Sequence, residues 1–133
     1  MSWKEKSGES FKATNKLITE GLYNTSVHCS YYSCVQLMYH TLEKYLNMDQ
    51  TEIKKESNES QSSHVWLINK VIQLLKQLTS KKDARNFSDS VHKLRKCRVS
   101  ADYDKEFVVE RDAVDLRQLS YDISKHLVTT FSL

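Results

Sequence analysis

The sequence predicts an all-α protein, an up-and-down bundle of four to five helices that spans residues 1–133 as one domain. The chain has no proline and only two glycines, so it lacks the turn residues on which sheets and glycine-rich loops depend. Its 39% hydrophobic and 28% charged residues are typical of a globular protein. A chain of 133 residues can also bury a core without disulfides or a metal.

Two helices are expected in the first part of the chain. The first covers about Glu9 to Gly21, where the glycine is typical of a helix end. The second covers about Thr25 to Asn47, and Asn24, Thr25 or Ser26 could cap its start by accepting a backbone N–H. It has the clearest amphipathic pattern, because apolar side chains recur at steps of three and four residues through six turns, namely Val27, Tyr31, Cys34, Val35, Met38, Leu42, Tyr45 and Leu46.

The second half of the chain follows a polar stretch. The segment near 49–63 is expected to be a mobile polar connector, because its Glu, Lys, Ser and Gln residues can bury little apolar surface. Periodicity then predicts a third helix from about Ser63 to Thr79 and a fourth from about Lys82 to Ala101. Residues 104–109 are expected to be extended, and a fifth helix is expected to start near Glu110.

The composition disfavours several classes of protein. The polar N-terminus has no secretion signal, and no stretch approaches the roughly 20 apolar residues of a membrane span. A cytoplasmic protein without membrane contact is therefore expected. The three cysteines (Cys29, Cys34 and Cys97) fit neither a disulfide framework nor a zinc spacing, and reduced thiols are expected. No metal and no cofactor are expected, because ligand-spaced histidines and a glycine-rich phosphate loop are both missing.

Positive charge is concentrated in one segment. Lys81 to Arg98 contains seven lysines and arginines against two aspartates, whereas the whole chain has a net charge of only +3. Such a segment either contacts a polyanion such as nucleic acid or forms a solvated helix face. In the first case Lys93 and Lys96 would contribute to binding.

Arg98 interrupts the apolar face of the predicted fourth helix. At about 100° per residue, its angular position around the helix axis lies between those of Phe87 and Val91, in the middle of the apolar stripe. An inward guanidinium needs an acceptor, because a buried unpaired charge is very unfavourable. Asp102, four residues later, could accept within the helix. Alternatively, Arg98 reaches solvent at a frayed helix end, or it binds phosphate in a cleft between helices or protomers.

Three motifs occur in a fixed order along the chain. In chain order they are the Tyr31-Tyr32 pair near the start of the long second helix, Ser63-His64 at the start of the third helix, and Arg98-Val-Ser-Ala-Asp-Tyr103. Together they resemble the HEPN superfamily (higher eukaryotes and prokaryotes nucleotide-binding domain), in the branch with an R-x-x-A-D-Y signature. The resemblance runs from about Leu22 to Leu127 and implies a HEPN-like helical bundle.

The resemblance also implies a range of activities. HEPN domains are often dimers, are often encoded beside a minimal nucleotidyltransferase, and include many metal-independent ribonucleases of toxin–antitoxin and phage-defence systems. Those enzymes place a His four to six residues after an Arg, so that Arg stabilises charge on the phosphate and His moves protons. Arg98 matches the Arg, but Tyr103 stands where the His would be. A phenol is a poor base at neutral pH, so weak or absent catalysis is expected.

Other histidines offer alternatives. His64 could approach Arg98 across the bundle and restore an Arg and His pair, or it could be a capping or core residue. Arg85 and His92 also fit the ribonuclease spacing of an Arg followed by a His. Their positions, however, predict solvated residues on the outer face of the helix. Tyr31 is expected in the core, and Tyr32 in the core or at a dimer interface.

Three functions follow from these observations. The first is a homodimeric, HEPN-like protein that binds RNA or a nucleotide through Arg98, Asp102 and Tyr103, aided by His64, Lys93 and Lys96. Its partner would be a cognate nucleotidyltransferase or antitoxin protein. The second is a metal-independent ribonuclease toxin that uses Arg98 with Tyr103 or His64. The third is a structural or protein-interaction bundle in which the motif only supports the fold.

Overall fold

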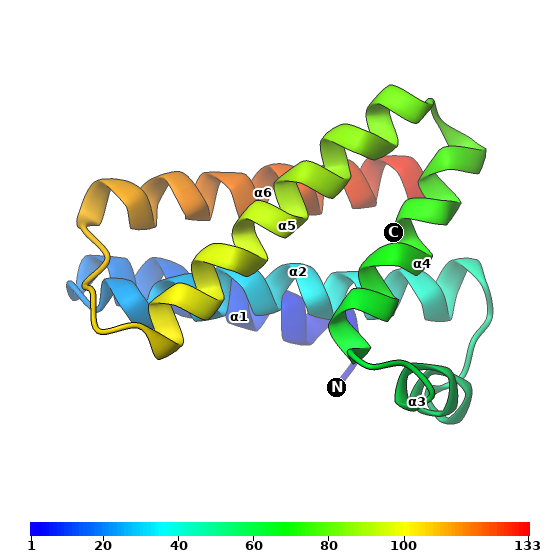
Figure 1. Cartoon of the computed structure of the whole chain (residues 1–133), viewed down its shortest axis with the longest axis horizontal. Helices are drawn as coiled ribbons and strands as arrows, with labels where there is room; N and C mark the ends of the chain where they lie inside the picture. Colours follow the sequence, from blue (N-terminus) through cyan, green and yellow to red (C-terminus); the bar gives the residue numbers. More distant parts are fainter.

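The protein consists of six helices without strands in a computed structural model that describes residues 1–133. The helices are α1 (Trp3–Thr19), α2 (Tyr23–Tyr45), α3 (Gln50–Asn58), α4 (Ser63–Leu78), α5 (Lys81–Tyr103) and α6 (Glu110–Phe131). The all-α class is therefore confirmed. Helix α2 contacts α1, α4, α5 and α6 (Figure 1). Helices α1 and α5 run in the opposite direction to α2 and α6.

The number of helices exceeds the four to five that were expected. The additional helix α3 occupies most of the segment near 49–63, so the expectation of a connector is corrected there. Asp49 begins this helix by accepting a hydrogen bond from the backbone N–H of Glu52 at 2.8 Å. Ile53 is buried and belongs to the hydrophobic core. One cap and one buried apolar side chain are thus the features that place a helix in a polar segment.

The start of the chain also differs from expectation. Helix α1 begins at Trp3 rather than near Glu9, because Ser2 and Glu5 form a capping box. The Ser2 hydroxyl accepts from the Glu5 backbone N–H at 3.1 Å, and the Glu5 carboxylate accepts from the Ser2 N–H at 2.9 Å. These two hydrogen bonds satisfy N–H groups that a helix start otherwise leaves unpaired.

No side chain caps the start of α2, so the expected capping by Asn24, Thr25 or Ser26 is wrong. The Ser26 hydroxyl donates to the carbonyl of Tyr23 instead, at 2.6 Å. The Asn24 amide bonds to the loop of residues 104–109, the α5–α6 loop, which is free of helix as expected.

Small polar side chains let other helices approach α2 closely. The hydroxyls of Ser7 and Ser33 each donate to the other residue's carbonyl, at 2.7 and 2.9 Å, which joins α1 to α2. On another face of α2, the Ser120 hydroxyl of α6 donates to the carbonyl of Ser30 at 2.7 Å. These buried hydroxyls are therefore satisfied, as buried polar groups must be.

The apolar core lies where α2, α4, α5 and α6 meet. Its fully buried aliphatic side chains include Leu42, Leu67, Ile68, Leu75, Val91, Leu94 and Leu127. Tyr31 is also fully buried, as expected. None of the six helices combines the length with the apolar content that crossing a lipid bilayer requires.

Candidate functional site

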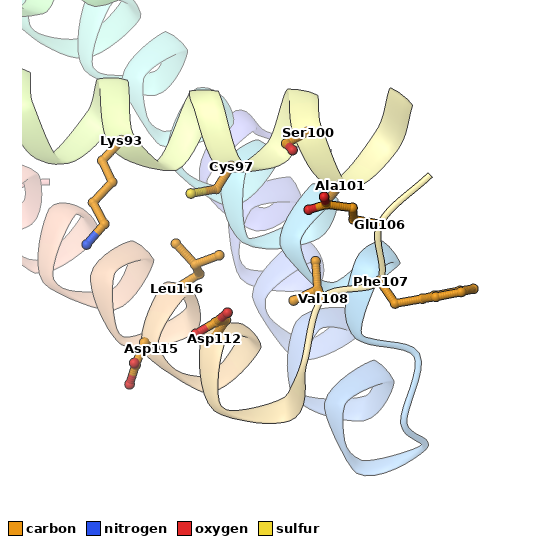
Figure 2. A pocket seen from close by; sticks show the side chains of 10 residues that line it. All are labelled: Lys93, Cys97, Ser100, Ala101, Glu106, Phe107, Val108, Asp112, Asp115 and Leu116. Atoms are coloured by element: carbon orange, nitrogen blue, oxygen red, sulfur yellow. The ribbon is translucent and has the colours of Figure 1, made fainter. Parts of the chain in front are cut away.

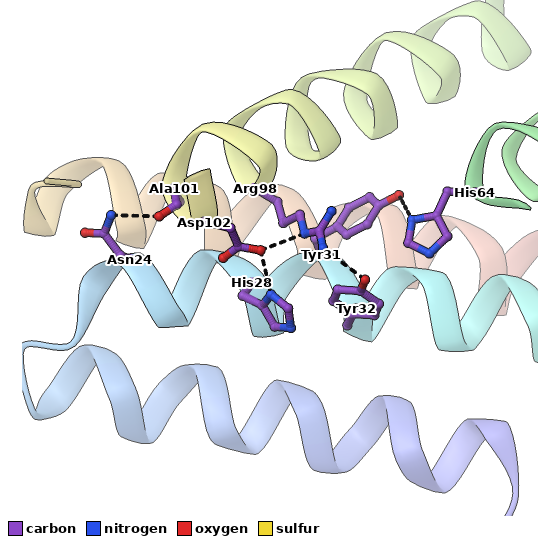
Figure 3. A network of polar contacts seen from close by, with 8 residues as sticks. All are labelled: Asn24, His28, Tyr31, Tyr32, His64, Arg98, Ala101 and Asp102. Atoms are coloured by element: carbon purple, nitrogen blue, oxygen red, sulfur yellow. Dashed lines mark hydrogen bonds and ion pairs between the residues drawn. The ribbon is translucent and has the colours of Figure 1, made fainter. Parts of the chain in front are cut away.

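Arg98 lies where α5 crosses α2, and its guanidinium is held by two side chains (Figure 3). Its Nε lies 2.9 Å from Oδ2 of Asp102, one turn later on α5. The N–H does not point along this contact, so the contact is an ion pair rather than a directed hydrogen bond. Nη2 donates to the hydroxyl of Tyr32 on α2 at 3.1 Å. The ion pair expected from the spacing is therefore present, and α2 provides a second anchor.

His28 of α2 contacts the same carboxylate oxygen. Its Nδ1 lies 2.8 Å from Oδ2 of Asp102, and its side chain is 42% exposed. The ring also packs against Tyr32, with centroids 4.6 Å apart. Sequence reasoning missed His28 as a site residue. The available signal was its position four residues before Tyr32, which places both on one face of α2.

Three tyrosine rings surround the guanidinium of Arg98. Its central carbon lies 5.2 Å from the ring centroid of Tyr32, 5.7 Å from that of Tyr31 and 5.9 Å from that of Tyr103. These are cation–π distances. The Arg98 side chain is only 14% exposed, yet Nη1 makes no hydrogen bond and is not a buried atom. The guanidinium is thus fixed in place, and its Nη1 has no hydrogen-bond partner within the protein.

His64 supports this arrangement indirectly. Its Nδ1 lies 3.0 Å from the hydroxyl of Tyr31. Burial, with Arg98 and Arg95 nearby, lowers the pKa of His64, and burial raises the pKa of Tyr31 to about 12. A neutral imidazole therefore accepts a hydrogen bond from a protonated phenol. The expected approach of His64 to Arg98 occurs through Tyr31, not through a direct contact.

Arg95 is a second arginine on the same face of α5, three residues before Arg98. Its Nε is buried without a hydrogen-bond partner, and its charge acts on the buried Tyr31. Of the two guanidinium groups, only that of Arg98 forms an ion pair, with Asp102. The excess of positive charge favours an anionic ligand. Sequence reasoning counted Arg95 in the basic segment but did not place it beside Arg98.

Other expected residues lie outside this cluster. Lys93 lines a hollow between α5, the α5–α6 loop and α6, together with Cys97 and three carboxylates (Figure 2). Lys96 is exposed, and its position two residues before Arg98 places it on roughly the opposite side of the helix. Arg85 and His92 are exposed on α5, as expected. We therefore define the Arg98 cluster as His28, Tyr31, Tyr32, His64, Arg95, Arg98, Asp102 and Tyr103.

Acidification is expected to destabilise the fold through His64. The pKa of His64 is lowered in the folded protein. Below the ordinary histidine pKa of about 6.5, the unfolded chain therefore binds more protons than the folded protein. The stabilisation from the neutral ring is complete above about pH 6.5 and is lost as the pH falls towards the folded pKa. Thermal unfolding is measured at about pH 7.5 and about pH 5.5. The decrease of Tm from the higher to the lower pH should be smaller in His64→Gln than in the wild type.

The exposed His92 provides the matched control for this measurement. His92→Gln should lose as much Tm on acidification as the wild type does. Equal losses in all three proteins would show that the His64 ring does not account for the acid sensitivity.

Comparison of the chain with protein-family models, with curated proteins and with solved structures gives no match.

Proposed function

We propose that this chain is a HEPN-like protein that binds RNA or a nucleotide through a phosphate at Arg98. The observation that carries the proposal is the fixed guanidinium, which has three aromatic rings around it and an Nη1 that is unpaired and not fully buried. A guanidinium matches the geometry of phosphate oxygens. Because its side chain is already held by Asp102 and Tyr32, little rotamer entropy remains to be lost on binding.

The local charge is consistent with this ligand. Arg95 contributes a second cation three residues before Arg98, and Asp102 is the carboxylate that forms an ion pair with Arg98. A phosphate would complete the electrostatic balance of the cluster. The motif from Arg98 to Tyr103 supports the same ligand class through its resemblance to nucleotide-binding HEPN domains.

The biological setting in this proposal comes from the resemblance. The protein would act in the cytoplasm as a homodimer within a toxin–antitoxin or defence module. A nucleotidyltransferase or antitoxin protein would be its partner. These elements are independent of the phosphate site and require separate tests.

Arg98→Ala is expected to weaken RNA binding by about tenfold or more, because a charge-assisted contact to phosphate is lost. Fluorescence anisotropy with a labelled oligouridylate of about 12 nucleotides measures the affinity. Arg85→Ala is the matched control, since it removes the same charge from an exposed site on the same helix. Equal affinities of the two variants would contradict the proposed site.

Unfolding measurements on the same variants test the structural alternative. If Arg98 only supports the fold, Arg98→Ala lowers the free energy of unfolding and leaves RNA affinity at the level of Arg85→Ala. A salt series adds a further criterion, since the slope of log affinity against log salt should be smaller in Arg98→Ala.

A second candidate function is metal-independent cleavage of the bound phosphodiester. The observation in its favour is that His28 and Arg98 contact the same oxygen of Asp102. A carboxylate that orients an imidazole is a common arrangement for proton transfer. In this proposal His28 takes the role that the sequence suggested for Tyr103 or His64. Denaturing gels of the binding samples, with a chelator present, decide the point. Shortened RNA with the wild type and intact RNA with His28→Ala would support cleavage.

A further inference from the structure

Tyr103 is an exposed aromatic side chain at the edge of the Arg98 cluster. It is the last residue of α5, and 73% of its surface is exposed. Its side chain makes no hydrogen bond and packs against no other ring, and its centroid lies 5.9 Å from the guanidinium carbon of Arg98. The other face of the ring is therefore free.

This position suits a nucleic-acid base. A base can stack on the free face of the ring while its neighbouring phosphate reaches the guanidinium. The base would stack on one face of the Tyr103 ring, and the guanidinium of Arg98 already contacts the other face. The base and its phosphate would therefore bind on the same side of the cluster. Tyr32 and Tyr31 cannot serve in this way, because Tyr31 is fully buried and Tyr32 is partly covered against the core.

We propose that Tyr103 stacks on an unpaired base, so that the ligand is single-stranded nucleic acid and not a duplex. The proposal rests on the proposed function, since the phosphate at Arg98 brings the base to the ring. Bases within a duplex are already stacked on one another and do not offer a free face. An unpaired base does, and stacking on an aromatic side chain tolerates any base.

An abasic oligomer separates stacking from phosphate binding, because it keeps the phosphates and lacks the bases. The probes are a labelled oligouridylate of about 12 nucleotides and an abasic oligomer of the same length. The wild type should bind the oligouridylate about tenfold more tightly than the abasic oligomer. A duplex of the same length should behave like the abasic oligomer.

Tyr103→Ala should reduce the ratio of the two affinities to about one, because the ring that distinguishes the bases from the bare phosphates is lost. Tyr103→Phe should keep the wild-type ratio, because the ring is retained. Phe107→Ala is the matched control, since Phe107 is a 90% exposed aromatic residue without contact to Arg98. It should also keep the wild-type ratio.

The results separate this inference from the proposed function. If Arg98→Ala weakens binding of both oligomers while Tyr103→Ala keeps the wild-type ratio, phosphate binding stands and stacking on Tyr103 is wrong. A loss of the ratio in Phe107→Ala equal to that in Tyr103→Ala would also overturn the inference. If the wild type binds neither oligomer, both RNA binding at Arg98 and the inference are wrong.

Discussion

Tyr31→Ala is expected to lower the free energy of unfolding by about 3–5 kcal/mol, as for other large buried aromatic residues. Tyr31 is fully buried in α2 and contacts three parts of the Arg98 cluster. Its ring lies 5.7 Å from the guanidinium carbon of Arg98 and meets the rings of Tyr32 and His64. Truncation leaves a cavity among these groups. Urea unfolding monitored by circular dichroism measures the loss.

Tyr31→Phe separates the ring from the hydroxyl. It keeps the buried ring and removes the hydrogen bond to Nδ1 of His64, so a loss of about 1 kcal/mol is expected. If the phenylalanine variant is as unstable as the alanine variant, packing of the ring contributes little and the prediction fails.

The two variants also relate the core to the site. Tyr31→Phe keeps the ring beneath Arg98, so RNA affinity should stay at the wild-type level. Tyr31→Ala removes one of the three rings around the guanidinium, and affinity should decrease even under conditions where the variant is fully folded. These results would show that a core residue positions Arg98, with one side chain contributing to both stability and the proposed binding.

The fold was predictable where the apolar pattern is continuous. Helix α2 was expected over Thr25 to Asn47, and it begins and ends only two residues earlier. The agreement is close because its stripe of buried side chains runs without interruption. Helix α3 was missed because Ile53 is the single apolar residue of its nine. The first turns of α1 are polar, and their start depends on a local capping box instead of on burial.

The site was predictable only within a single helix. The pairing of Arg98 with Asp102 follows from a spacing of four residues. The contacts of Asp102 with His28, and of Arg98 with Tyr32, depend on how far α5 is rotated and shifted across α2. That relation is set by packing of the whole core, and no local pattern in the sequence specifies it.

Asn24 is the second residue whose replacement is expected to have a large effect. Its Nδ2 donates to the carbonyls of Ala101 at 3.0 Å and Glu106 at 3.3 Å, and its Oδ1 accepts from the N–H of Val108 at 3.0 Å. One amide therefore joins the start of α2 to the end of α5 and to the α5–α6 loop. Asn24→Ala leaves these backbone groups without their partner, and a loss of about 2–3 kcal/mol is expected. Hydrogen exchange at the Val108 amide should become faster.

Asn24→Asp distinguishes this bridging role from helix capping. Aspartate is as good an N-cap residue as asparagine, so a capping role predicts a variant as stable as the wild type. In the structure the side-chain amide must donate to two carbonyl oxygens, and a carboxylate cannot donate when ionised. It would instead place a negative charge beside both oxygens, so Asn24→Asp should be at least as unstable as Asn24→Ala at neutral pH. Wild-type stability in Asn24→Asp would show that the bridge to the α5–α6 loop contributes nothing. Because this loop directly follows Tyr103, loss of the bridge should also release the end of α5 and reduce the preference for oligouridylate over the abasic oligomer.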